Sequence, residues 1–469
     1  MKGLEVSVVS ISKVIASAET RRLDPEYFQK QHLADAALIE RRPHDFQSFT
    51  DFGLKVDASA FYPAIEQFYG SGDLPFLRVA DVDALIDFET CTRIPASLCE
   101  RFPTLARVYP GDIIFTKGGS VARVGLVTQQ AAVSRDLIFL NSSTLPRNEQ
   151  TFLYLYFQTI FFNRMLIRSS SQTAQPHLTI TLVRNLPVFR AGVPLKDKCV
   201  EIVEQAFSAC ADAITKTREA EAALTAALGL VGWQPPEPLT YTRRAFETFG
   251  ARRFDAEFFR PKFTALVERL RKRGGAVLLG DMLASCDRGR QPAYTENGLP
   301  VINSQHVQNG YVLLDESNRF ATVEDESLKI QSGDVLVNGT GVGTIGRVAP
   351  YLHPTPALPD NHVTILRIKR GIALDPIFLA VQLGGLVGRL QVEQYFKGSS
   401  GQIELYPQDI AKFTIWLGTP EIQKTVRNKV EAAYEAKARG RILLARAKYA
   451  VEIAIEKSEA AALKYLKEN

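Results

Sequence analysis

The chain has few cysteines and no pattern that would use them for metal or disulfide chemistry. Its five cysteines are an odd number among 469 residues, and none belongs to a C-x-x-C pair, which speaks against a zinc site. Cys199 and Cys210 lie within or beside an apolar helical pattern, where we expect reduced, buried thiols. This usage favours a reducing, cytoplasmic environment.

Long hydrophobic runs are also missing. The most apolar stretch, residues 152–162, is shorter than the roughly 18 apolar residues that a membrane-spanning helix needs. The N-terminus lacks the charged-then-apolar pattern of a signal peptide. We therefore expect no membrane association, and we expect residues 152–162 to form a buried helix.

Catalytic signatures are missing as well. The sequence has no G-x-x-x-x-G-K-[ST] loop, no H-E-x-x-H pair and no Asn/Asp-Pro-Pro-Tyr/Phe loop of amino-methyltransferases. Of the six histidines, only His306 and His362 fall in comparable loops of one segment, and no third metal ligand accompanies them. We expect this chain to be no enzyme and to hold neither a metal nor a cofactor.

One glycine motif is typical of a nucleotide-binding enzyme instead. Residues 341–346 match the G-x-G-x-x-G dinucleotide fingerprint, which needs a helix N-terminus after the glycines to hold the pyrophosphate. Here the glycines lead into a short β-like run that Pro350 ends. Glycines in a tight hairpin are the better interpretation, and a nucleotide-binding enzyme is the less favoured alternative.

What the sequence does contain is an internal repeat. The segment Arg21–Phe28 returns as Arg252–Phe259, and a Gly-Asp turn before a glycine-punctuated strand pair occurs at Gly111 and again at Gly333. An apolar helix, a Ser/Gln-rich loop and a short strand follow in the same order each time. Two related globular segments are therefore predicted.

A long helix closes each segment. Apolar residues recur at alternating four- and three-residue steps from Val203 to Leu228, and the same rhythm returns from Val426 to Ala454, with Lys437 as an interruption. A helix over residues 195–228 would be on the order of 50 Å long. We expect the two helices to pair antiparallel and to act as a spacer.

These patterns give an α+β fold with defined boundaries. Two similar mixed α/β domains, residues 1–194 and 241–419, are separated by two long helices that form an antiparallel coiled-coil-like spacer. The first helix spans residues 195–230 and the second residues 420–469. Residues 231–240 form a proline-rich linker, because Gly229 can end a helix and the prolines cannot continue one.

Equivalent loops of the two repeats carry different polar residues. The segment Pro75–Val82 aligns with Pro300–Val307, and the apolar frame is kept while the polar positions change. Arg78, Ala80 and Asp81 of the first repeat become Asn303, Gln305 and His306 in the second. Such a scaffold suits the reading of different base pairs, since Arg fits guanine and Asn or Gln fits adenine, although neutral drift of surface loops would give the same pattern.

Further polar residues are candidates for contacts with the DNA backbone. They are Lys117, Arg123, Asn338 and Arg347 in the glycine hairpins, and Ser170, Gln172, Lys397, Ser399 and Gln402 in two hydroxyl-rich loops. Ordinary solvated turns are an equally good interpretation of each loop. The net charge of +5 permits nucleic-acid binding without demanding it.

In this combination the sequence resembles the DNA-specificity subunits of Type I restriction-modification systems over nearly its whole length. The resemblance rests on the doubled R-x-D-x-E-[FY]-F motif, the doubled Gly-Asp hairpin, a loop-then-strand segment with His177, and a long helix after each half. The motif residues are Arg22, Asp24 and Glu26, then Arg253, Asp255 and Glu257. The loop-then-strand segments are residues 176–188 and 403–415, and His177 joins the candidate DNA-binding residues.

The resemblance implies a function and partners. Each domain would read one half of a bipartite, asymmetric site in double-stranded DNA, and the helices would measure the unread spacer. They would also dock two adenine-N6 methyltransferase subunits, which hold S-adenosylmethionine, and motor-nuclease restriction subunits would join them in a bacterial or archaeal cytoplasm. Specificity chains of related systems with a fused methyltransferase-nuclease partner look similar, and a coiled-coil scaffold without a DNA role is a third reading.

Overall fold

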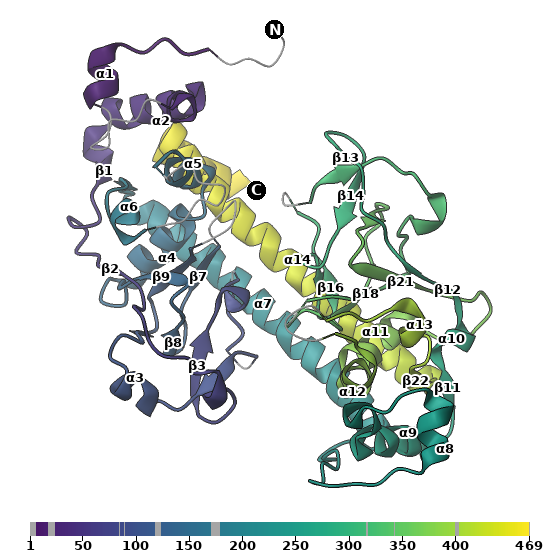
Figure 1. Ribbon diagram of the computed structural model, residues 1–469. Coiled ribbons are helices and arrows are strands. Elements are labelled where there is room, and N and C mark those ends of the chain that lie inside the picture. The colour runs from purple at the N-terminus through teal and green to yellow at the C-terminus, as the bar shows by residue number, and fades with distance from the viewer. Residues whose placement is uncertain are drawn as a thin grey trace. The chain divides into compact units, whose positions relative to one another are not determined.

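The chain folds into two compact units. Unit 1 comprises Met1–Ala211 and Lys437–Asn469, and unit 2 comprises Asp212–Ala436 (Figure 1). The computed structural model describes residues 6–16, 24–83, 85–88, 90–117, 123–169, 179–315, 318–341, 343–398 and 403–468. Both units mix helices and sheets, so the predicted α+β class is confirmed.

Unit 1 contains two four-stranded sheets and a two-stranded one. The first sheet has the order β2 (Val56–Asp57), β9 (Leu137–Leu140), β6 (Ile113–Thr116), β7 (Val124–Leu126). The second has the order β4 (Thr92–Ile94), β3 (Leu74–Leu77), β8 (Ala131–Val133), β5 (Arg107–Val108), and β1 (Phe46–Gln47) pairs with β10 (Val188–Phe189). Its shorter helices are α1 (Ile11–Ala16), α2 (Lys30–Arg41), α3 (Ser97–Arg101), α4 (Arg147–Tyr156), α5 (Ile160–Ser169) and α6 (Ile180–Arg184).

Unit 2 repeats this plan. One sheet has the order β12 (Leu283–Arg288), β21 (Val363–Ile368), β18 (Val335–Asn338), β19 (Val348–Pro350). Another has the order β13 (Tyr294–Thr295), β17 (Phe320–Ala321), β14 (Leu299–Ile302), β20 (Leu358–Pro359). The pairs β11 (Ala276–Leu278) with β22 (Thr414–Trp416) and β15 (Val307–Gln308) with β16 (Tyr311–Val312) complete the strands. Its shorter helices are α8 (Ala245–Ala251), α9 (Pro261–Arg273), α10 (Leu279–Met282), α11 (Pro376–Gly384), α12 (Leu386–Tyr395) and α13 (Pro407–Ile410).

The sequence repeat is therefore a repeat of topology. In both units the strand after the Gly-Asp turn, β6 or β18, pairs antiparallel with its hairpin partner on one side and with β9 or β21 on the other. In both units one parallel pair, β3–β8 or β14–β20, belongs to the second sheet. The loop after β3 and the loop after β14 consequently occupy equivalent places.

The Gly-Asp turn shows why this dipeptide recurs. Gly111 and Gly333 have φ angles of 94° and 96°, a backbone region that favours glycine. The Asp112 carboxylate accepts a hydrogen bond from the Tyr109 N–H at 2.8 Å, and the Asp334 carboxylate accepts one from the Gln331 N–H at 2.9 Å. Each dipeptide thus closes a turn that starts a central strand.

The repeated opening motif is likewise structural. Arg253 makes two hydrogen bonds to Asp255, at 2.8 and 2.6 Å, and its guanidinium lies 4.5 Å from the centre of the Phe258 ring. The Phe258 carbonyl accepts a bond from Gln394 of α12. In unit 1 the carbonyl of Tyr27, at the matching position, accepts one from Arg168 of α5. The motif therefore ties the start of each repeat to its apolar helices.

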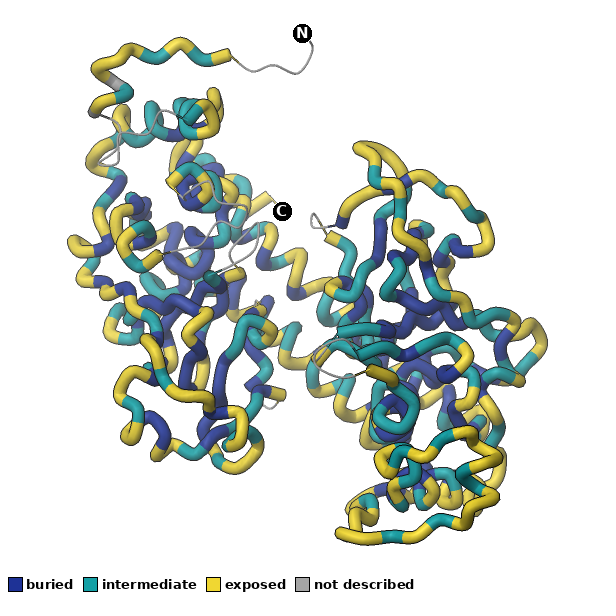
Figure 2. Tube along the Cα trace, viewed as in Figure 1, coloured by how far each residue is buried: buried dark blue, intermediate teal, exposed yellow. Residues whose placement is uncertain are grey.

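The core of unit 1 is rich in aromatic residues. Phe49, Phe115, Phe157 and Phe162 are at most 1% exposed and lie among helices α4 and α5 and the first sheet (Figure 2). The predicted buried helix at residues 152–162 is buried, but it is two helices, because α4 ends at Tyr156 and α5 begins at Ile160. No helix in the described part of the chain is long and apolar enough to cross a membrane.

The two long helices are present. α7 spans Val193–Ala227 and α14 spans Pro420–Glu456, so the first ends before the predicted residue 230. The predicted continuation to residue 469 is a separate helix, α15 (Glu459–Glu468). The Glu459 carboxylate accepts the Gly192 N–H at 3.0 Å, and this contact fixes the start of α15 at the start of α7.

Within each unit the helices pack in opposite directions. In unit 1, Ala206 from the first part of α7 shares the core with Ala447 and Val451 from the last part of α14. In unit 2, Leu224 from the last part of α7 shares the core with Val430 from the first part of α14, and Lys429 lies 2.5 Å from Glu219. The predicted antiparallel pairing is confirmed.

Lys437, the charged residue predicted to interrupt the apolar seam, is half-buried in unit 1. Burial lowers the pKa of its amino group to about 8, and Arg441 adds to this effect, whereas Asp83 and Cys210 oppose it. A charged lysine is therefore tolerated in the seam at a cost, since burial disfavours its protonated form.

The close approach of α7 and α14 at Gly440 predicts the effect of a substitution. A Cβ atom on Gly440 would lie 2.6 Å from the Cys210 sulfur and 3.0 Å from the Ala206 carbonyl oxygen. We expect Gly440→Ala to destabilise unit 1, because overpacking costs about 1–3 kcal/mol and outweighs the gain of up to about 1 kcal/mol in helix propensity. Thermal unfolding should show a lower midpoint.

Gly384→Ala is the control for this substitution. Gly384 is the last residue of α11, and the nearest atom to its added Cβ would be the Val348 carbonyl oxygen at 4.0 Å. Its midpoint should stay the same or rise slightly. Equal behaviour of the two variants would mean that the seam has room at Gly440.

Candidate nucleic-acid interface

In unit 1 the candidate residues Arg78 and Asp81 follow β3 and bind each other. The backbone N–H and the Nε–H of Arg78 donate to the Asp81 carboxylate at 2.9 and 3.3 Å. The Asp81 side chain is 11% exposed and that of Arg78 is 40% exposed. Asp81 therefore positions Arg78, and the outer part of the guanidinium faces solvent.

The glycine hairpin between β6 and β7 reaches the same loop. Arg123, at the end of this hairpin, donates from its guanidinium to the Val79 carbonyl at 2.6 Å. Lys117, at the other end, donates to the carbonyl of Arg135, and burial lowers the pKa of its amino group. The structure thus brings Arg78, Asp81 and Arg123 together around one loop.

In unit 2 the equivalent loop after β14 is held by its own side chains. The Asn303 side-chain oxygen accepts the Gln305 N–H at 2.9 Å, and the Gln305 carbonyl accepts the side-chain amide of Gln308 at 2.6 Å. Arg347 of the β18–β19 hairpin lies 3.5 Å from the Gln308 side-chain oxygen. Gln305 is exposed, so this loop presents an amide, whereas the equivalent loop of the first repeat presents the guanidinium of Arg78.

Two predicted DNA-binding residues have a different role. His306 is 2% exposed, and its Nδ1 accepts the Asn303 N–H at 3.1 Å. Asn338 is fully buried, and its side-chain amide donates to the carbonyls of Thr340 and Thr344 at 2.9 and 2.8 Å. Because neither side chain reaches solvent, this is a correction: both residues hold the loops in shape.

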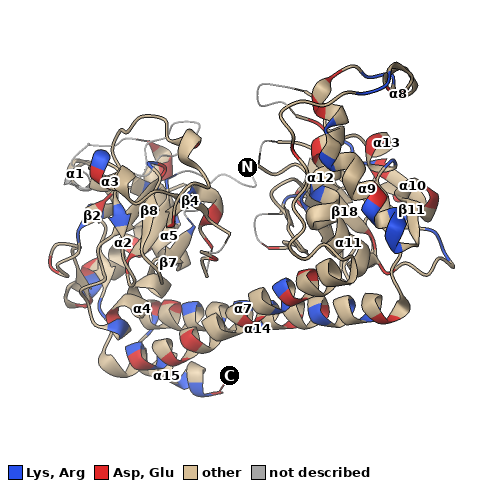
Figure 3. Ribbon diagram, turned by 90° about the horizontal axis from the view of Figure 1, so that it is seen from below, with Lys and Arg blue, Asp and Glu red and all other residues tan. Residues whose placement is uncertain are grey.

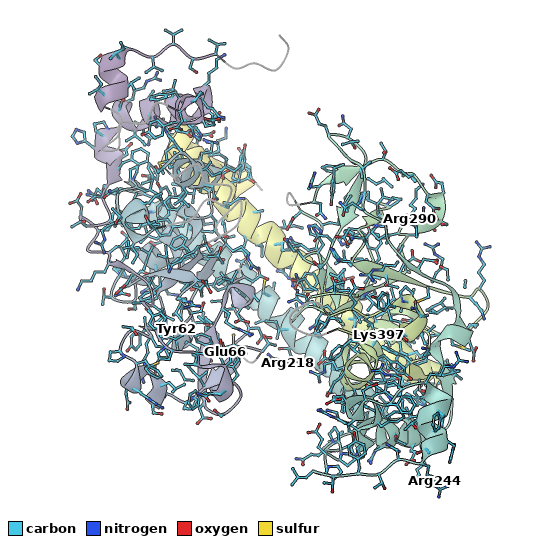
Figure 4. All side chains as sticks on the ribbon, in the orientation of Figure 1. Tyr62, Glu66, Arg218, Arg244, Arg290 and Lys397 are labelled. Atoms are coloured by element: carbon cyan, nitrogen blue, oxygen red, sulfur yellow. The ribbon has the colours of Figure 1, made fainter. Side chains whose placement is uncertain are left out.

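The Ser/Gln-rich loops are only partly described. Lys397 pairs with Asp409 at 2.7 Å, and its amino group lies 5.4 Å from the centre of the Tyr406 ring (Figure 4). Its side chain is 47% exposed, so it keeps a solvent-facing part. Five other candidates lie outside the described residues, namely Ser170, Gln172, His177, Ser399 and Gln402.

The glycines at 341–346 form the turn of the β18–β19 hairpin. Gly341 and Gly346 have φ angles of 88° and 77°, and the chain continues into β19. A dinucleotide site needs a helix at this point, so this turn does not have the geometry of one. In the parts of the chain that the structure describes, no group of three His, Cys, Asp or Glu residues is placed to hold a metal ion.

Sequence reasoning missed two polar residues near these loops. Gln308 connects Arg347 to the loop after β14, and Arg290, which precedes β13, has a side chain that is 76% exposed and lies 3.6 Å from Asp325 (Figure 4). Gln308 follows Gln305 by three residues and could have been included with that loop. No local sequence pattern identifies Arg290, because the position of its loop depends on the fold.

Comparisons with known proteins find no match to a family model and none to a curated protein. Among solved structures, the chain is similar to the S subunit of a Type I restriction-modification system from M. genitalium, with 11% identity over 90% of this chain and 95% of that chain and a TM-score of 0.34. It is also similar to the HsdS subunit from Thermoanaerobacter tengcongensis, with 15% identity over 90% and 93% and a TM-score of 0.25.

A third similar structure is the type IIG restriction endonuclease BpuSI, with 10% identity over 38% of this chain and 28% of that chain and a TM-score of 0.31. The two S subunits are matched over nearly the whole chain and the endonuclease over a part of it.

The buried His306 predicts a pH dependence of stability. Burial lowers the pKa of its imidazole, and Asp315 only partly opposes this. Because the folded-state pKa is lower than the unfolded one, the stability that neutral His306 contributes is present above about pH 6.5 and is lost as pH falls. We expect His306→Asn, whose side-chain oxygen can replace Nδ1 as acceptor, to flatten the fall of the unfolding midpoint between about pH 7 and pH 5.

Gln305→Ala is the matched control in the same loop. Its exposed side chain should leave both the midpoint at pH 7 and the pH profile unchanged. Identical pH profiles of the wild type and His306→Asn would show that the pKa of His306 does not differ between the folded and the unfolded chain.

Proposed function

We propose that this chain is the DNA-specificity subunit of a Type I restriction-modification system. It would read a bipartite, asymmetric target in double-stranded DNA and recruit two adenine-N6 methyltransferase subunits, with no catalytic step of its own. The observation that carries the proposal is the repeat itself: one fold, present twice, offers different polar groups at equivalent loops. In the alignment, Asn303 of unit 2 stands in place of Arg78 of unit 1, and Gln305 stands in place of Ala80.

The chemistry of these loops suits base readout. A guanidinium makes bidentate bonds to the O6 and N7 acceptors of guanine, whereas a carboxamide matches the N6 donor and N7 acceptor of adenine. Asp81 orients the Arg78 side chain so that the outer N–H groups of Arg78 face solvent. Gln305 is exposed. Because the two loops offer different groups, the two half-sites would differ in sequence.

The hairpin arginines support a phosphate role. Arg123 and Arg347 follow equivalent hairpins and each reaches the reading loop of its own unit. Cations at such places would fix the register of the protein on the duplex without reading bases. Lys117 and Lys397 would add to this, each from a position where a protein carbonyl or carboxylate already binds it.

The long helices are the proposed docking surfaces for partners. Cationic and anionic side chains alternate along α7 and α14 (Figure 3), and Ile442 and Tyr449 of α14 are 68% and 50% exposed. These two residues are seven apart and therefore share a helix face. The methyltransferase subunits would supply S-adenosylmethionine, and motor-nuclease subunits would complete the restriction complex in the bacterial or archaeal cytoplasm.

A genome-wide map of N6-methyladenine, with and without the gene for this chain, tests the proposal. We expect deletion to remove methylation from one split, asymmetric motif, which would also reveal the target and its spacer. Purified chain with its methyltransferase should bind that duplex less tightly as salt rises. An unchanged map in a host that expresses the complex would contradict the specificity role.

A double substitution tests the reading loop of unit 2. Asn303→Ala with Gln305→Ala should relax recognition of one half-site, since each bidentate contact contributes about 1–3 kcal/mol of discrimination. The other half-site should be read as before. The measurement is the methylation motif of the variant complex together with its affinity for duplexes altered in one half.

Gln331→Ala is the control, because Gln331 is exposed at the opposite end of β18 from the glycine hairpin. It should leave both half-sites unchanged. If the double variant also recognises the full wild-type motif, the loop after β14 has no part in readout.

A further inference from the structure

Helix α8 of unit 2 has an unusually apolar exposed surface. Phe246, Phe249 and Phe254 are 67%, 66% and 71% exposed, and the Phe249 and Phe254 rings pack edge to face at 5.5 Å. Burying a phenylalanine side chain contributes about 1.5–3 kcal/mol relative to leaving it exposed. Three such exposed rings in one short segment indicate a surface that a partner covers.

The surface is held in place by specific contacts. The Glu247 carboxylate accepts the Arg244 N–H at 3.0 Å at the start of α8. Arg252 closes the helix at φ 52°, a left-handed conformation that costs a non-glycine residue energy. Arg243 donates to the Phe259 carbonyl at 3.1 and 2.9 Å, so the segment around α8 is anchored to the chain that leads into α9.

Cations accompany the three rings. The side chains of Arg244 (Figure 4) and Arg252 are exposed, and among the described residues neither guanidinium forms an ion pair, although the neighbouring Arg253 and Arg260 do. Phe246, Phe249, Phe254, Arg244 and Arg252 together are called the α8 patch. Arginine with aromatic residues is the composition of protein–protein interfaces, from which lysine is depleted.

The first repeat opens in a similar way. Helix α1 exposes Ile11 and Ile15 at 77% and 56%, and by the alignment of Arg21–Phe28 with Arg252–Phe259, Ile15 corresponds to Phe246. In the sequence Lys13, Arg21 and Leu23 correspond to Arg244, Arg252 and Phe254, whereas Ala18 corresponds to Phe249 and Ile11 to Thr242. An apolar, cationic segment therefore precedes both repeats.

We infer that the α8 patch binds an apolar surface ringed by carboxylates on an adenine-N6 methyltransferase subunit, and that α1 binds the same surface of a second copy. The inference rests on the proposed function. Because two similar segments occur on one chain, we expect two copies of one partner to bind. Because the exposed arginines have no carboxylate partner among the described residues, we expect the partner to carry acidic groups at this surface. This contact adds an anchor at the start of each repeat to the docking surface on the long helices.

The test measures binding of the separately purified methyltransferase subunit to the full chain by titration calorimetry, with the number of copies counted by native mass spectrometry. We expect the wild type to bind two copies. F246S/F249S/F254S and the charge reversal R244E/R252E should each weaken one of the two binding steps by at least about tenfold. I11S/I15S should weaken the other step.

R271E/R370E, which reverses two exposed arginines elsewhere in unit 2, controls for net charge and should bind as the wild type does. Unchanged thermal midpoints, expected for exposed side chains, exclude misfolding. Two unaltered binding steps in the α8 variants would overturn the inference alone. So would a loss of duplex-DNA affinity without a loss of methyltransferase binding, which would make the patch a nucleic-acid surface. No binding by the wild type would overturn the proposed recruitment and this inference with it.

Discussion

The contact between α7 and α14 closes the hydrophobic core of each unit. In unit 1 the two helices pack through small residues, since Ala206, Gly440 and Ala447 are buried where the two backbones approach. The sheet-bearing part is then tied to α14 by directional bonds. Arg42 donates to the carbonyls of Ala454 and Ile455, at the last turn of α14, and Ile160 donates to Glu452. Such bonds satisfy carbonyls that a helix end leaves without partners.

The two repeats keep one fold while their interior chemistry differs. In unit 1, Arg164 of α5 makes two bonds to the buried Asp35 of α2. The matching positions in unit 2 hold Leu266 and Leu390, which are 0% and 6% exposed. A buried ion pair and a pair of leucines are interchangeable when the volume is filled and the charges are bonded. The same tolerance allows the loops after β3 and β14 to change their polar groups without changing the scaffold.

Polar residues of the candidate interface divide into those that shape loops and those that face solvent. The side chains of His306 and Asn338 hydrogen-bond to the backbone of their own loops, and the Asp81 carboxylate accepts a hydrogen bond from Arg78. Arg78 and Gln305 keep groups at the surface. The side-chain nitrogen of Asn338 donates to two carbonyls of the hairpin turn, which holds the turn in shape, while its buried side-chain oxygen has no hydrogen-bond partner among the described residues.

The sequence by itself determined the repeat, the α+β class and the two long helices, because these depend on local periodicity and on turn residues such as Gly111 and Asp112. It also predicted that the glycines at 341–346 form a hairpin, from the β-like run that follows them. Tertiary structure alone decided that α14 ends at Glu456, that Arg123 meets the loop after β3, and that His306 lies inside while Gln305 lies outside. Burial and long-range contacts depend on which elements pack together, and no local pattern of residues contains that information.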